Sequence, residues 1–281
     1  MIACYDLARC PPTYDVVAFL AHAELERVRR GEKYIDLYVM PGPVGGFRQD
    51  NLWPPTIEER VQLREHVLVP LCALLPSVRR MHVLSDRGPL PLDAFGVGKY
   101  IISLPAIVSA LGEGCRPLRA ALAMAKGDYI TFTLREAKHH PLRNSRVAEW
   151  VAAARTLERD GLVVIIVRDT LRVDDQITGA RVCYGAAKSL QERAQLYAGA
   201  VLNVGICNGP MWMAVFMDAP VLMLRPTTNA ARGCYDDGFY ARHGVARGAQ
   251  LPTSPPHQRL VWEDDTRECI VAAVKAMLVP A

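Results

Sequence analysis

A strand–turn–helix–strand unit in the second half of the chain places the strongest restriction on the fold. A strand-like run at residues 200–204 is followed by Asn208-Gly209-Pro210, a helix-like run at 213–217 and a second strand-like run at 221–224. Strands joined through a helix run parallel in one sheet, since parallel strands need a crossover connection. The unit therefore predicts an α/β protein with parallel sheets.

The same alternation of strands and helices runs along the whole chain. The predicted strands are residues 2–4, 35–40, 81–84, 129–134 and 162–167, and the predicted helices are residues 15–30, 57–75, 146–159 and 189–197. Glycine and proline gather between residues 112 and 127, as they do in a connection between two domains. We expect one α/β domain at residues 1–118 and a second at residues 119–281.

Composition indicates a folded protein of enzyme size. The 281 residues are 51% hydrophobic and 22% charged, which is enough for two cores. A net charge of +4 without a basic block argues against nucleic acid as a partner. The eight cysteines form no C-x-x-C pair and no Cys/His cluster, and residues 162–167, the longest aliphatic run, cannot cross a bilayer. We expect a cytoplasmic protein with no metal site and no transmembrane segment.

The turn at residues 208–211 is the clearest candidate for a binding site. Gly209 lets a ligand approach the backbone, and Pro210 in the first helical turn lacks only an N–H that would be unpaired there. The remaining N–H groups, those around Met211 included, and the positive end of the helix dipole can face an anion such as a nucleotide diphosphate. The alternative is an ordinary helix start in which Asn208 serves only as the N-cap.

Polar residues follow the predicted strands of the second half directly. Arg135 comes after residues 129–134, Arg143 and Asn144 follow it closely, and Arg225 ends the 221–224 strand. Ligands of open parallel sheets gather at the carboxyl ends of the strands. A guanidinium such as that of Arg135 is a planar fork suited to two phosphate oxygens. The alternative for Arg135 is a salt bridge to Glu136 or to a neighbouring lobe.

Residues 189–212, which end in Gly209-Pro210-Met211-Trp212, resemble the donor-binding segment of bacterial heptosyltransferases and related family 9 glycosyltransferases of the GT-B class. The family segment ends in Gly-Pro-Met-His, so Trp212 stands where the family has histidine. Arg135 also resembles the phosphate-binding arginine of fucosyltransferase-type members. The resemblance implies two Rossmann-like domains with a cleft between them. It also implies that the last helix packs back on the first domain.

The resemblance further implies a glycosyltransferase of hexosyl or heptosyl type. Such an enzyme moves a sugar from a nucleotide-diphosphate donor to the hydroxyl of a glycan or other acceptor. It is metal-independent and inverting, and it uses no cofactor besides the donor substrate. Two alternatives stay open: a non-catalytic protein that binds a nucleotide sugar or glycan, and a nucleotide-sugar epimerase of similar architecture.

A transferase of this kind needs a general base for the acceptor hydroxyl, and the first domain should supply it. Asp86 follows the strand around residues 81–85, and Asp15 begins the helix after the first strand. Each also fits a structural role, Asp15 as a helix N-cap and Asp86 as a turn residue. Arg48, at the end of the glycine- and proline-rich loop 41–48, is a candidate anion contact on the acceptor side.

Overall fold

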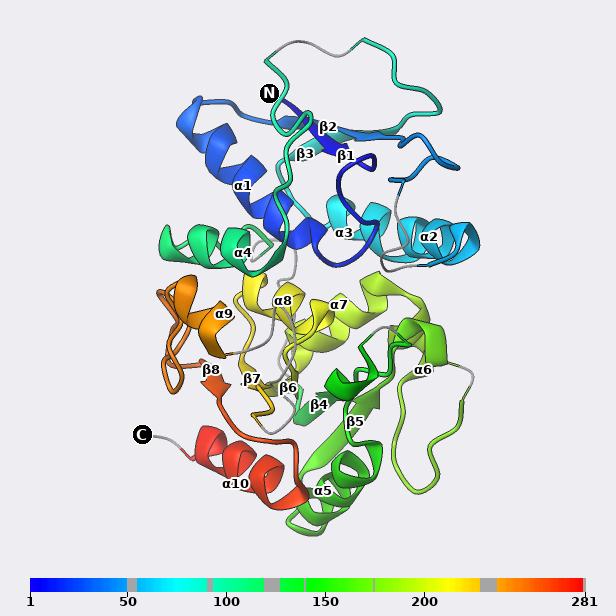
Figure 1. Ribbon diagram of the computed structural model, residues 1–281. Helices are drawn as coiled ribbons and strands as arrows, with labels where there is room; N and C mark the ends of the chain where they lie inside the picture. The colour runs from blue at the N-terminus through cyan, green and yellow to red at the C-terminus, as the bar shows by residue number, and fades with distance from the viewer. Residues whose placement is uncertain are drawn as a thin grey trace. The chain divides into compact units, whose positions relative to one another are not determined.

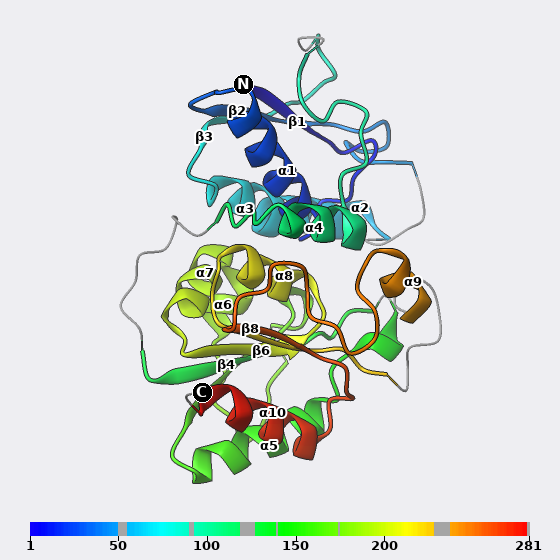
Figure 2. The same cartoon turned by 90° about the vertical axis from the view of Figure 1, so that its left-hand side faces the viewer.

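The computed structural model describes residues 1–49, 55–89, 93–118, 127–138, 140–173, 175–227 and 237–279. It divides into two compact units, Met1–Ala121 and Leu122–Ala281 (Figures 1 and 2). Both are built from parallel strands and helices, so the α/β fold class is confirmed. The exact boundary that the sequence places between residues 118 and 119 stays a prediction, and residues 119–126 beside it lie outside the described residues.

The first unit contains a three-stranded parallel sheet in the order β1-β2-β3. Its strands are β1 (Ile2–Asp6), β2 (Ile35–Met40) and β3 (Val78–Val83). Its helices are α1 (Val16–Arg29), α2 (Ile57–Leu63), the π-helical turn η1 (Arg64–Leu68), α3 (Val69–Ala73) and α4 (Ser103–Gly112). Helix α1 contacts both α3 and α4, and in Figure 2 these helices lie on one face of the sheet.

Helix α1 forms because its apolar residues recur at helical spacing. Val16, Phe19, Leu20 and Ala23 are all buried, and the Phe19 ring meets the Tyr5 ring of β1 edge-on, with centroids 5.2 Å apart. Full burial of each large side chain contributes about 1.5–3 kcal/mol. This packing fixes α1 on the sheet and places its first turn, where Asp15 lies, near the carboxyl end of β1.

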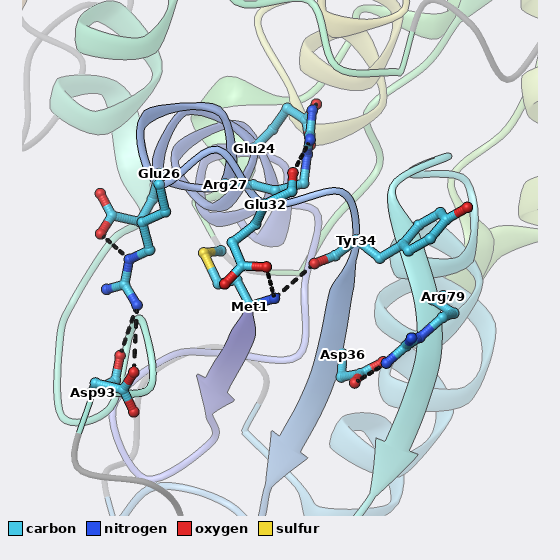
Figure 3. Close-up of polar contacts among 10 residues, drawn as sticks. Met1, Glu24, Glu26, Arg27, Glu32, Tyr34, Asp36, Arg79 and Asp93 are labelled. Carbon is cyan, nitrogen blue, oxygen red and sulfur yellow. Dashed lines mark hydrogen bonds and ion pairs between the residues drawn. The ribbon is translucent and has the colours of Figure 1, made fainter.

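Polar contacts join the N-terminal ends of the three strands (Figure 3). The Met1 ammonium donates to the Tyr34 carbonyl at 2.8 Å, which ties the start of β1 to the residue before β2. Asp36 of β2 and Arg79 of β3 form an ion pair with 2.7 Å between Oδ2 and Nη2. Exposed pairs of this kind contribute about 0–1 kcal/mol each, so the apolar packing contributes more to the stability of this unit.

The second unit contains a five-stranded parallel sheet in the order β5-β4-β6-β7-β8. Its strands are β4 (Tyr129–Thr133), β5 (Val163–Val167), β6 (Leu202–Ile206), β7 (Val221–Leu224) and β8 (Gln258–Val261). Its α-helices are α5 (Val147–Arg159), α6 (Tyr184–Lys188), α7 (Leu190–Gly199), α8 (Gly209–Phe216), α9 (Asp237–Arg242) and α10 (Arg267–Leu278). Helices α5 and α10 lie together on one face, and α6, α7 and α8 cover the other (Figures 1 and 2).

The C-terminal helix α10 belongs to the core of this second unit. Ile270 and Val274 are fully buried, and the helix packs against α5 and β7. The packing on the first domain that the resemblance implies stays a prediction. The helix has partners in its own unit because its apolar stripe completes the layer that covers the sheet beside α5.

The strand order creates a switch point between β4 and β6. The chain passes from β4 through α5 to β5 on one side, and β6 then pairs with the opposite edge of β4. Connections that leave neighbouring strands in opposite directions open a crevice at their carboxyl ends, where open α/β sheets bind ligands. The segments after β4 and β6 are therefore the places to look for a site.

Gly205 of β6 lies directly under the first turn of α8, which gives a testable packing prediction. A Cβ at this position would be 2.8 Å from the Met211 sulfur and 3.0 Å from the Thr133 carbonyl oxygen. We expect Gly205→Ala to lower the free energy of unfolding by about 1–3 kcal/mol, measured by urea denaturation. Gly112→Ala is the control, because a Cβ there meets nothing within 4 Å. Equal losses in both variants would contradict the close approach.

Candidate functional site

The N-terminus of α8 carries a buried hydrogen-bond donor. Asn208 is the N-cap, and its side-chain oxygen accepts from the Met211 N–H at 3.0 Å, as the capping interpretation predicts. The residue is only 6% exposed, and its amide nitrogen has no hydrogen-bond partner among the described residues. Native proteins rarely leave such a group unsatisfied. With Gly209 and Pro210 in the same turn, an anion at this helix end would accept from it.

Arg135 organises the loop that follows β4. It is 8% exposed, and its Nη1 donates to the His140 carbonyl at 3.0 Å and to the Asn144 side-chain oxygen. Its own backbone N–H donates to the Ser145 hydroxyl at 2.9 Å. The predicted site residues Arg135 and Asn144 therefore lie together, with part of the guanidinium engaged by the loop itself. The carboxylate of Glu136 pairs with a different arginine, which is discussed below.

Arg143 links this loop to the start of α8. Its Nη2 donates to the Cys207 carbonyl at 3.3 Å, one residue before Asn208. Burial lowers the pKa of His140, and the charges of Arg143 and Arg135 lower it further, so both guanidinium groups act on the same loop. The structure thus brings two predicted cations and the predicted cap to the switch point between β4 and β6.

Arg225, at the end of β7, is enclosed by other side chains. It is 3% exposed, and its guanidinium carbon lies 4.5 Å from the Tyr240 ring centroid and 4.6 Å from that of Trp262. Its Nη1 lies 2.8 Å from an oxygen of Asp237. The predicted ligand contact is therefore surrounded by groups of the protein.

In the first unit, Asp15 stands at the start of α1. It occupies the N-cap position, but its side chain makes no capping hydrogen bond, and instead accepts from the Thr13 hydroxyl at 2.7 Å. The side-chain cap that the residue type and position predict is therefore not formed.

Asp15 and Arg48 act on the same neighbours. Burial raises the pKa of Tyr100, the Arg48 charge lowers it and the Asp15 charge raises it, and Arg48 also hydrogen-bonds to this tyrosine. Burial raises the pKa of Cys10 to about 12, with smaller contributions of opposite sign from the same two charges. The charges of Asp15 and Arg48 thus act on the same two side chains, Tyr100 and Cys10. Sequence reasoning missed Tyr100, which is 61% exposed.

Asp86 takes the structural role that its sequence context allows. It is exposed, and its Oδ1 accepts from the Gly88 N–H at 3.0 Å in a tight turn. The next residue, Arg87, instead forms a two-pronged pair with the buried Asp6 at the end of β1, at 2.8 and 2.9 Å. No local sequence pattern indicates this pair, because its members are 81 positions apart along the chain.

The Asp6–Arg87 pair predicts a pH effect on stability. Burial raises the pKa of Asp6, but the hydrogen bonds and charge of Arg87, together with backbone hydrogen bonds from Ala8 and Gly98, outweigh it and leave the pKa below its ordinary value of 3.8. A carboxylate with a depressed pKa stabilises the fold above its unfolded pKa, and this stabilisation is lost as the pH falls through the folded pKa. We expect the free energy of unfolding to fall more steeply below pH 3.8 in the unaltered protein than in Asp6→Asn. Parallel pH profiles in chemical denaturation would contradict this.

The described residues contain neither a cluster of metal ligands nor a helix that could span a membrane. No group of three or more His, Cys, Asp or Glu side chains is placed to hold a metal ion in that part of the chain. Within the same residues, no helix is long and apolar enough to span a membrane.

Comparison with known proteins identifies the fold. No protein-family model and no curated protein matches the chain. Among solved structures, it resembles a family 9 glycosyl transferase from Veillonella parvula (11% identity, 99% of this chain and 96% of that one, TM-score 0.50). It also resembles the E. coli ADP-heptose lipopolysaccharide heptosyltransferase II (13%, 99% and 98%, TM-score 0.50). A third similar structure is TibC, an iron-containing dodecameric glycosyltransferase of enterotoxigenic E. coli (13%, 99% and 74%, TM-score 0.51).

The similarity covers both units, including the first half of the chain, where the sequence resemblance fades. At 11–13% identity it establishes fold and not activity. The chain has the fold of the GT-B glycosyltransferases, with two Rossmann-like units.

Proposed function

We propose that the chain is a metal-independent, inverting glycosyltransferase that uses a nucleotide-diphosphate sugar as donor and the hydroxyl of a glycan as acceptor. The observation that carries this proposal is the buried, unsatisfied amide of Asn208 at the N-terminus of α8. It lies at the switch point of the sheet, and Arg143 donates to the carbonyl of Cys207, the residue before Asn208. The GT-B fold, shared with an enzyme whose name specifies ADP-heptose, supports a sugar nucleotide as the ligand.

The proposed reaction is a single displacement at the anomeric carbon. The acceptor oxygen forms a bond to that carbon while the bond to the diphosphate oxygen breaks, and the diphosphate leaves with the electron pair. The α8 N-terminus and the Arg143 guanidinium stabilise the negative charge that develops on it. Asp15 accepts the proton of the acceptor hydroxyl, and Arg48 contacts an anionic part of the acceptor.

Asn208→Ala tests the binding half of the proposal. We expect calorimetric titration with a panel of nucleoside diphosphates to give about tenfold weaker binding or more for the best ligand, since a hydrogen bond to a charged group contributes about 1.5–3 kcal/mol. Thr266→Ala is the matched control: Thr266 caps α10 in the same way, accepting from the Cys269 N–H. Both variants lose a cap, but only the first loses the proposed ligand contact. Equal affinities in the two variants, or no binding by the unaltered protein, would refute the site.

The alternative is a non-catalytic protein that binds a nucleotide sugar. Trp212, in the first turn of α8, favours it, because the similar family has histidine at this position and any hydrogen bond from that side chain must be supplied differently. Turnover separates the two functions. Consumption of a sugar nucleotide in the presence of an acceptor identifies a transferase, whereas tight binding without consumption identifies the binder.

A further inference from the structure

We infer that Arg225 is a positioning residue that strengthens diphosphate binding at α8 without touching the ligand, acting through Tyr240 and Cys207. The inference rests on the proposed function, because it concerns the same anion site. It assigns Arg225 a role different from the direct ligand contact that its place at a strand end predicts.

The first step is the enclosure of the guanidinium. The Arg225 guanidinium lies against both the Tyr240 and the Trp262 ring, and the two rings meet each other edge-on with centroids 5.6 Å apart. Asp237 lies on a further side of the guanidinium, and Tyr240 is 1% exposed. A guanidinium stacked on aromatic faces and shielded from water holds its neighbours in fixed positions. Arg225 therefore joins β7 to α9 and to the segment after β8.

The second step connects Tyr240 to the anion site. Its hydroxyl hydrogen-bonds to the Cys207 thiol. The backbone of Cys207 is held as well, since its N–H donates to the Leu224 carbonyl at 3.0 Å and its carbonyl accepts from Arg143. Cys207 is thus fixed at its side chain, its nitrogen and its oxygen. The next residue is the cap Asn208, so these contacts set the direction in which the Asn208 side chain and the N-terminus of α8 point.

The third step is electrostatic. Burial raises the pKa of Cys207 to about 11, while the Tyr240 hydrogen bond and the charges of Arg225 and Arg143 lower it. The positive charge of Arg225 therefore stabilises negative charge at Cys207, close to the start of α8. Buried charges are screened by salt much less than exposed ones. Arg225 adds to the positive potential at the helix end in the way that Arg143 does, but from behind the site.

The experiment measures the affinity of ADP and of inorganic pyrophosphate by calorimetry in four variants of the full chain. Arg225→Met removes the charge and keeps a long apolar side chain, and Tyr240→Phe keeps the ring stack and removes only the bond to Cys207. We expect about tenfold weaker binding in the first and several-fold weaker binding in the second, within the usual range of coupling between neighbouring groups. Arg225→Lys should regain part of the loss because it restores the charge.

Arg247→Met is the matched control. Arg247 also pairs with Asp237, at 3.3 Å, but its side chain is 61% exposed, and we expect unchanged affinity. If Arg225→Met does not fold, as judged by near-ultraviolet circular dichroism, the Tyr240→Phe result decides. Wild-type affinity in the folded variants, or an Arg225→Lys protein as weak as Arg225→Met, would overturn the inference. No binding by the unaltered protein would overturn the proposed function together with it.

Discussion

Replacing Asp15 by asparagine is expected to lower the rate of sugar transfer at least about 100-fold and to leave nucleoside-diphosphate binding unchanged. A positioned general base contributes about 10²–10⁴ to a rate, and an amide cannot accept the proton of the acceptor hydroxyl. Asn is close to Asp in size, so the contact with the Thr13 hydroxyl can be retained. The measurement is kcat for donor consumption with acceptor present, alongside calorimetric affinity for the diphosphate.

Asp86→Asn separates the two candidate bases. Asp86 is exposed and its carboxylate is used in a turn, where an asparagine side chain can accept the same hydrogen bond from Gly88. We therefore expect kcat within about twofold of the unaltered protein, as for most surface substitutions. If Asp86→Asn lost transfer and Asp15→Asn kept it, the assignment of the base would be reversed.

The strands and helices with strong hydrophobic periodicity were predicted well from the sequence. Strands β2 and β7 have the predicted bounds, and α1 and α5 begin and end within one residue of them. Ser189, the first residue of the helix predicted at 189–197, is the N-cap of α7 and accepts from the Glu192 N–H at 3.2 Å. In each case the signal is local, since it depends on residues within one or two turns or on alternate strand positions.

Other elements lacked such a local signal. Strand β3 begins at Val78 and includes Arg79 and Arg80. These two charged residues interrupt the apolar pattern by which a strand is recognised in a sequence. Inside the second sheet, Thr131 and Asn203 are fully buried and bonded to each other across neighbouring strands at 2.7 Å. A polar residue is tolerated there only because a partner 72 positions away satisfies it, and no local pattern shows that partner.

The candidate site also contains one feature with a local sequence signal and one without. The cap role of Asn208 follows from its own short motif and is confirmed in geometry, whereas its role toward a ligand stays a prediction. The enclosure of Arg225 was not predictable, because Tyr240 and Trp262 come from segments after β7 and β8. A guanidinium at a strand end can face a ligand or an aromatic pair, and only the tertiary contacts distinguish the two.

Arg168→Met is expected to lower the free energy of unfolding by about 3–5 kcal/mol, the usual cost of leaving one member of a buried ion pair unpaired. Arg168 and Glu136 have side chains 5% and 8% exposed, and the guanidinium meets both carboxylate oxygens, with 2.9 Å from Nε to Oε2. Urea denaturation measures the loss. The pair joins Arg168, which follows β5 directly, to Glu136 in the loop after β4, next to the switch point.

The double variant Arg168→Met/Glu136→Leu shows whether the loss comes from an uncompensated charge. Replacing both members of a buried pair by apolar residues is often close to neutral, so we expect the double variant to be more stable than Arg168→Met alone. Additive losses would mean that the two side chains act independently. If the double variant also binds the diphosphate normally, the pair stabilises this edge of the sheet without shaping the anion site. Weaker binding at restored stability would show instead that the β4 loop, with Arg135 and Arg143, depends on the pair for its position.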